Sequence, residues 1–112
     1  MLFAVAVAAT GIIAGCANAP LRTEASTSGI RAAEEAGAAK VPSASLQLQL
    51  AKEELESAKS LAAKGEKVQA DSMLRRAEAD AELAVTLSHE DAEKSEAMAA
   101  VERARQLRKD NQ

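Results

Sequence analysis

Small apolar residues recur every three or four positions through the second half of the chain. Between residues 43 and 64, one helical face is marked by Leu48, Ala51, Leu55, Ala58 and Ala62. Spacings of three and four return to the same side of an α-helix, whereas a half-buried strand alternates at every second residue. The pattern therefore predicts an amphipathic helix over residues 43–64.

The same spacing returns just after residue 65 and continues almost to the C-terminus. Its first half is marked by Ala70, Leu74, Ala77, Ala81, Ala84 and Ser88. The spacing resumes further on in an apolar stripe, which consists of Ala97, Met98, Val101 and Ala104. We expect one helix over residues 66–109, with an alternative in which residues 88–91 form a capping motif that restarts the helix.

Proline and glycine mark the boundaries of these helices. Pro42 restricts the residue before it to an extended conformation, so a first helix over residues 28–40 should end just before it. Proline is favoured at the first position of a helix, which makes Pro42 the start of the second helix. Gly65 is expected in the left-handed conformation that ends a helix. Gly37 has two interpretations: it lets another backbone approach closely, or it frays the end of the first helix.

The helix lengths predict an overhang. At about 1.5 Å per residue, residues 43–64 span about 33 Å and residues 66–109 about 66 Å. A chain that folds back at Gly65 can pair only the first half of the last helix. We therefore predict an all-α fold with no sheet, in which a short helix precedes a helical hairpin within one domain over residues 28–112. The segment after Ser88 is then either a frayed, solvated helix or a surface that binds a partner.

Composition excludes several functions. Alanine supplies 28 of the 112 residues and the one aromatic side chain is Phe3, so a thick core is not expected. The net charge of −3, with both signs interspersed, argues against nucleic acid as a partner. One cysteine and one histidine form no metal-binding or nucleophilic motif, and we interpret His89 as a solvated surface residue. We expect no enzyme activity, no metal and no small-molecule substrate.

The N-terminal region carries a different signal. Residues 2–12 contain no charged side chain and lead into Ile13-Ala14-Gly15-Cys16, as the hydrophobic part of a signal peptide leads into its cleavage site. The four-residue motif resembles the lipobox of bacterial lipoproteins. The resemblance implies a signal peptide over residues 1–15, cleavage before Cys16, and diacylglycerol and N-acyl groups on Cys16. Residues 16–27 would then be the lipidated cysteine and a flexible tether, because small polar residues dominate the rest of this segment.

Alternatives to lipidation exist in the same region. Cys16 can be interpreted as a small hydrophobic residue at the end of an ordinary signal peptide or a membrane anchor. A rival cleavage site, Ala17-Asn18-Ala19, fits the small-x-small rule, but it is followed by Pro20, which such peptidases tolerate poorly. By resemblance to lipoproteins of Gram-negative bacteria, a residue other than Asp after the cysteine implies the outer membrane. Ala17 therefore predicts a lipid anchor in the outer membrane, with the protein on its periplasmic face.

The helical region also resembles a family. The pattern consists of Gly37-Ala38, Pro42, Leu50-Ala51, Leu55, Ala58, Leu61, Gly65, Ala70, Leu74, Ala77 and Asp80-Ala81-Glu82-Leu83-Ala84. Over residues 30–87 it is similar to the bacterial envelope lipoproteins grouped as domain of unknown function 4398. That family implies an α-helical periplasmic domain, sometimes joined to or encoded near OmpA-like peptidoglycan-binding domains, and no established activity. The chain departs from the family after the turn glycine, where Glu66-Lys67-Val68 replace the usual Asp and aromatic residue.

Two functional hypotheses follow from these patterns. The first is a structural or adaptor lipoprotein of the cell envelope, which binds an OmpA-like or other envelope protein through the apolar stripe. The second is a coiled-coil spacer that associates with further copies of itself through seams of alanine and leucine.

Overall fold

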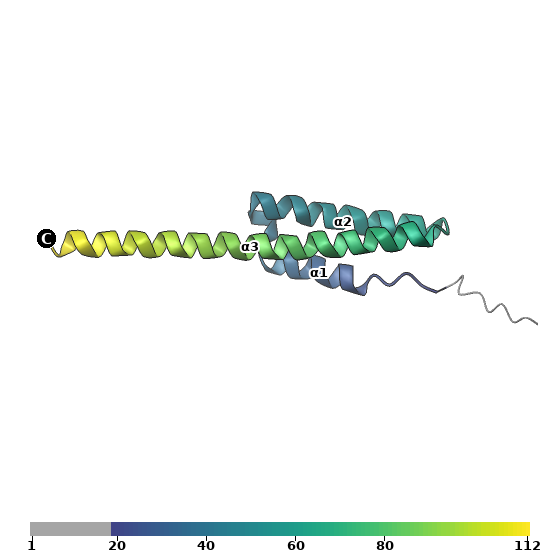
Figure 1. The fold of residues 1–112 in the computed structure, drawn as a ribbon, viewed down its shortest axis with the longest axis horizontal. Coiled ribbons are helices and arrows are strands. Elements are labelled where there is room, and N and C mark those ends of the chain that lie inside the picture. Colours follow the sequence, from purple (N-terminus) through teal and green to yellow (C-terminus); the bar gives the residue numbers. More distant parts are fainter. Residues whose placement is uncertain (1–18) are drawn as a thin grey trace, which may run out of the picture.

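The computed structural model describes residues 19–112, which form a helical hairpin with a third, shorter helix packed beside it (Figure 1). The elements are α1 (Glu24–Glu35), a 3₁₀ turn η2 (Ala38–Lys40), α2 (Pro42–Ala63) and α3 (Lys67–Asp110). The described residues contain no strand. The predicted all-α hairpin, with a short helix before two antiparallel ones, is confirmed.

Both ends of α2 are determined locally, as the sequence predicts. Val41 is extended, with φ −106° and ψ 114°, and Pro42 follows as the first helical residue. At the other end Gly65 has a φ of 80°. The N–H of Gly65 donates to the Ala62 carbonyl at 3.0 Å, and the next N–H donates to the Leu61 carbonyl at 2.9 Å. This pair of bonds is a Schellman motif, which satisfies two carbonyls at the end of the helix and reverses the chain.

The expected bounds of the first helix and tether were wrong. α1 begins at Glu24 rather than near residue 28, so residues 24–27 are helical and not part of a tether. The cause is a contact far away in sequence, because the buried Ser26 hydroxyl donates to the Leu74 carbonyl at 3.0 Å. α1 also ends earlier, at Glu35. Gly37 follows in a left-handed conformation with a φ of 82°, so it belongs to the turn between α1 and η2.

Close backbone approach occurs at another glycine. A Cβ added to Gly37 would meet nothing within 4 Å, which rules out the first interpretation of that residue. A Cβ added to Gly29 would lie 3.2 Å from the Cβ of Ala81, closer than side chains normally pack. Gly29 therefore allows α1 to lie close against α3.

α3 is one uninterrupted helix of 44 residues and extends well past the end of the hairpin (Figure 1). It spans about 66 Å, against about 33 Å for the 22 residues of α2. The alternative with a break at residues 88–91 was wrong. The Ser88 hydroxyl donates to the Ala84 carbonyl one turn earlier, at 2.8 Å, so it bonds back along a continuing helix instead of capping a new one.

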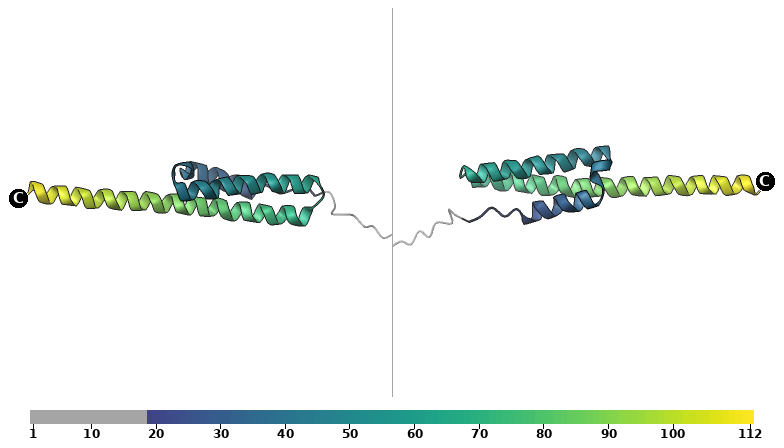
Figure 2. Two further views of the ribbon diagram at one scale, coloured as in Figure 1. Left: turned by 90° about the horizontal axis from the view of Figure 1, so that it is seen from above. Right: turned by 180° about the vertical axis from the view of Figure 1, so that it is seen from behind.

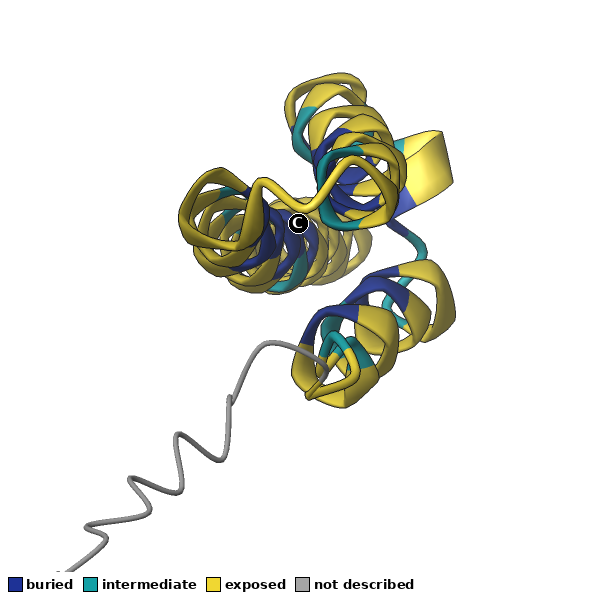
Figure 3. Cartoon of the chain, turned by 90° about the vertical axis from the view of Figure 1, so that its right-hand side faces the viewer, coloured by how far each residue is buried: buried dark blue, intermediate teal, exposed yellow. Residues whose placement is uncertain are grey.

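The core lies where the three helices face one another, and Figure 3 shows the buried residues on these inward sides. The six residues predicted for the first half of α3 are all buried, as are the first four of the five predicted for α2. Ala62, the fifth, is half-buried near the turn. α1 contributes Ile30 and Ala33. The described core lies entirely between residues 26 and 88, so a chain that begins at Ala17 retains all of it.

We predict that Leu55→Asp unfolds the hairpin. Leu55 is 8% exposed, and a carboxylate in its place would be buried without a partner, at a cost of several kcal/mol. Far-UV circular dichroism of the chain from Ala17 should show a large loss of helical signal at 25 °C. The matched control is Leu46→Asp on the same helix, where the side chain is 57% exposed and the signal should persist. Equal helicity in the two variants would contradict the assigned core.

Candidate functional site

The candidate site is the C-terminal part of α3, residues 89–110, which we call the overhang. Every residue in it is exposed, and no other described element lies beside it (Figures 1 and 2). The apolar stripe lies here: Met98 is 73% exposed and Val101 is 53% exposed. Ala97, Met98 and Val101 line a shallow surface depression together with Glu102 and Arg105. The structure therefore brings three of the predicted stripe residues together on an uncovered surface.

The direction in which the stripe faces differs from the prediction. Ala97 lies nine residues after Ser88 in a continuous helix. At about 100° per residue, nine residues amount to two and a half turns. Ala97, Val101 and Ala104 therefore lie on the side of α3 opposite the buried face that ends at Ser88. The stripe does not resume the hairpin face, and a longer α2 would not cover it.

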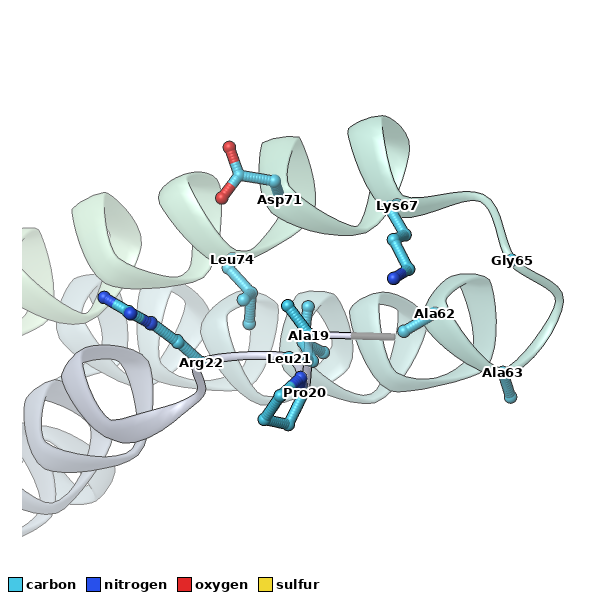
Figure 4. A pocket seen from close by; sticks show the side chains of 10 residues that line it. All are labelled: Ala19, Pro20, Leu21, Arg22, Ala62, Ala63, Gly65, Lys67, Asp71 and Leu74. Atoms are coloured by element: carbon cyan, nitrogen blue, oxygen red, sulfur yellow. The ribbon is translucent and has the colours of Figure 1, made fainter. Parts of the chain in front are cut away.

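The N-terminal end of the described chain lies at the other end of the molecule. Ala19 and Leu21 line an open pocket of about 570 Å³ beside the α2–α3 turn, together with Ala62 and Gly65 (Figure 4). Lys67 also lines this pocket. The C-terminus lies at the far end of α3 (Figure 2). The predicted lipobox residues Ile13, Ala14 and Gly15 and the predicted lipidation site Cys16 lie outside the described residues.

The pocket beside the turn shows little that points to chemistry. Its remaining charged side chains are Arg22 and Asp71. The Asp71 carboxylate is already paired with Arg75 at 2.9 Å, and it points away from the pocket in Figure 4. The pocket is best described as the place where the N-terminal segment passes along the end of the hairpin.

A buried carboxyl group lies between α2 and α3. The Glu54 side chain is only 12% exposed, and its Oε1 accepts from Arg76 Nε at 3.1 Å. Its Oε2 is buried and has no donor. Burial raises the pKa of Glu54, and a hydrogen bond and the negative charge of Asp80 raise it further, while Arg76 opposes the shift. If Glu54 and Asp80 shared one proton, Glu54 Oε2 would have a hydrogen-bond partner. Two ionised carboxylates have no proton to donate and would leave Oε2 without one.

Glu54 was not predicted from the sequence, although a signal was present. Glu54 lies three residues after Ala51 and four before Ala58, both of which belong to the predicted buried face. A charged residue at that spacing is normally placed at the edge of an apolar face, with its head group in water. Here the opposing α3 covers it.

In comparisons with known proteins, no protein-family model, curated protein or solved structure matches the chain. The similarity to domain of unknown function 4398 stays a prediction from sequence. Within residues 19–112, no group of three His, Cys, Asp or Glu side chains is placed to hold a metal ion. None of the described helices combines the length and the apolar character needed to cross a membrane.

We predict that Glu54→Gln stabilises the hairpin at neutral pH. Folding raises the pKa of Glu54 above its ordinary value of 4.5, so protonation of this group favours the folded state. That contribution is fully present below pH 4.5 and is lost as the pH rises through the folded-state pKa. A glutamine amide can donate to Asp80 while its oxygen accepts from Arg76, at any of these pH values. The free energy of unfolding should rise by about 1 kcal/mol at neutral pH.

Urea unfolding between acidic and neutral pH, followed by circular dichroism, measures this effect. Wild type should lose stability through Glu54 as the pH rises, and Glu54→Gln should have a flatter profile. Glu78→Gln is the control, because Glu78 is an exposed carboxylate on α3. If Glu54→Gln and Glu78→Gln have the same pH profile, the Glu54–Asp80 contact does not affect stability.

Proposed function

We propose that this protein is a lipid-anchored helical lipoprotein of the outer membrane that acts in the periplasm as a structural or adaptor protein of the cell envelope. In this proposal the lipid on Cys16 fixes one end, and the overhang at the other end binds a protein partner. An OmpA-like or other envelope protein is the partner that the family resemblance implies. The proposal assigns no reaction to the chain.

One observation carries the proposal: the N-terminal end of the described chain and the overhang lie at opposite ends of a rod (Figure 1). Ala19 lies beside the α2–α3 turn, and the overhang begins about 33 Å away along α3. Cys16 is three residues before Ala19, a separation of at most about 11 Å along the chain. A lipid on Cys16 would therefore attach near the turn, and the stiff helix would hold the overhang away from that attachment.

The surface of the overhang suits a helical partner. Met98 and Val101 are exposed apolar side chains on a helix that has no neighbour among the described elements. An amphipathic helix normally gains most of its stability by burying such a face. Ala97 and Ala104 beside them leave room for a second helix to approach closely, and the charged residues on either side can set its register.

The lipid anchor is tested at Cys16. We predict that Cys16→Ser yields an unprocessed precursor that incorporates no labelled acyl chain, because a serine hydroxyl cannot replace the thiol as the site of diacylglycerol transfer. Ala17→Ser is the matched control and should be processed and labelled as in wild type. Normal acyl labelling of Cys16→Ser would rule out the anchor.

The binding surface is tested by a double substitution in the overhang, Val101→Glu with Ala104→Glu. Cross-linked envelope complexes should be lost, because two carboxylates would interrupt the apolar stripe. Helicity should change little, because both positions are exposed. The control is Ala92→Glu with Ala99→Glu, which places two carboxylates on the same segment but on the side facing away from the stripe. If complexes survive the first pair of substitutions, the overhang is not the binding surface.

A further inference from the structure

The overhang is divided into two halves of opposite charge. Residues 89–97 contain four acidic residues and one lysine, which gives a net charge of −3. Residues 102–110 contain four basic residues and two acidic ones, Glu102 and Asp110, which gives +2. No charged residue lies between these two segments. The first half of the overhang is therefore net acidic and the second half net basic, although both signs are interspersed in the chain as a whole.

These charges have few partners within the described chain. Glu102 and Arg105 form an ion pair at 3.8 Å, a long separation for a contact between two exposed side chains. It is the only ion pair that lies within residues 89–110 of the described structure. In the described structure no ion pair joins the acidic half to the basic half of the same copy. Most of the charge on the overhang is therefore open to a second molecule.

The point at which the charge changes sign coincides with the centre of the stripe. The outermost stripe residues are Ala97 and Ala104, so the centre lies between Ala100 and Val101. If a second overhang lies antiparallel to the first about this centre, the two stripes face each other. The acidic half of each copy then faces the basic half of the other. A parallel arrangement places acidic on acidic and basic on basic, which is unfavourable.

The hairpin leaves room for this arrangement. Ala97, Val101 and Ala104 of the stripe lie on the side of α3 opposite the face that packs against α1 and α2. The C-terminal end of a second copy can therefore pass along the free side of α3 toward Ser88 without meeting either helix. The two hairpins then lie at the outer ends of the pair.

We propose that the partner of the overhang is a second copy of this chain, paired antiparallel through the stripes about a two-fold axis. This inference rests on the proposed function, because it takes the overhang as the binding surface. Two α3 helices of about 66 Å that overlap by about 33 Å form a rod of about 100 Å. The two N-terminal ends lie at opposite ends of that rod.

Charge exchange tests the pairing in the chain from Ala17. One variant carries Arg103→Glu, Arg105→Glu and Arg108→Glu; the other carries Glu90→Lys, Glu93→Lys and Glu96→Lys. In sedimentation equilibrium, wild type should form a dimer whose dissociation constant rises about tenfold or more in each variant alone. An equimolar mixture of the two variants should regain dimerisation. Wild type that remains a monomer at every concentration would overturn the inference.

Cysteine cross-linking tests the orientation. The chain from Ala17 has no native cysteine, so Ala97→Cys and Ala104→Cys each introduce a unique one. In the antiparallel pair, position 97 of one copy faces position 104 of the other, within the distance of about 7 Å that a disulfide requires. A mixture of the two variants should therefore oxidise mainly to the mixed dimer. A predominance of 97–97 and 104–104 dimers would show parallel pairing and overturn the inference.

The result separates this inference from the proposed function. If the purified chain is monomeric but cross-links in cells still depend on Val101 and Ala104, the partner is a different protein. The inference is then wrong and the proposed function stands. If neither association depends on the stripe, both are wrong.

Discussion

The structure depends on how closely three helices can approach one another. Most of the buried contact positions are alanine, and α1 lies close against α3 where Gly29 meets Ala81. Alanine buries little area, so the few large apolar residues, such as Leu48, Leu55 and Leu74, supply most of the hydrophobic free energy. At this short distance a side chain on one helix can also reach a backbone carbonyl on another. The Ser26 hydroxyl on α1 donates to the Leu74 carbonyl on α3 in this way. The same closeness explains how α3 covers the carboxyl of Glu54.

The turn at Gly65 gives the two halves of α3 different surroundings. The first half faces α1 and α2, and its inward positions are almost entirely small and apolar. The second half has no neighbour, and Ala97, Val101 and Ala104 of its stripe lie on the opposite side of the helix. Ala92 and Ala99 keep the phase of the hairpin face, whereas the exposed stripe does not. The change of phase, together with the separation of charge, indicates a surface with its own requirements.

Sequence predicted the features that local chemistry determines. Pro42 and Gly65 act through their own backbone preferences, so both helix boundaries could be predicted from one residue each. The start of α1 could not, because the ordering contact of Ser26 is 48 residues away. Ser88 was ambiguous for another reason: a serine hydroxyl can cap a new helix or bond to a carbonyl one turn earlier, and sequence does not distinguish them. The stripe residues were predicted, but their direction required the helix to be continuous.

Continuity of α3 also links the stability of the hairpin to the order of the overhang. An isolated helix of about 20 residues is marginal in water, mainly because its first turn is costly to form. The packed first half of α3 is already helical, so the overhang does not have to form a first turn of its own. It only extends an existing helix through residues that favour the helical conformation. Arg108 and Lys109 in the last turn interact favourably with the helix dipole at the free end. The stripe is thus already helical before a partner arrives, which lowers the entropic cost of binding. Loss of the hairpin would remove the binding surface as well, although every residue of the overhang is exposed.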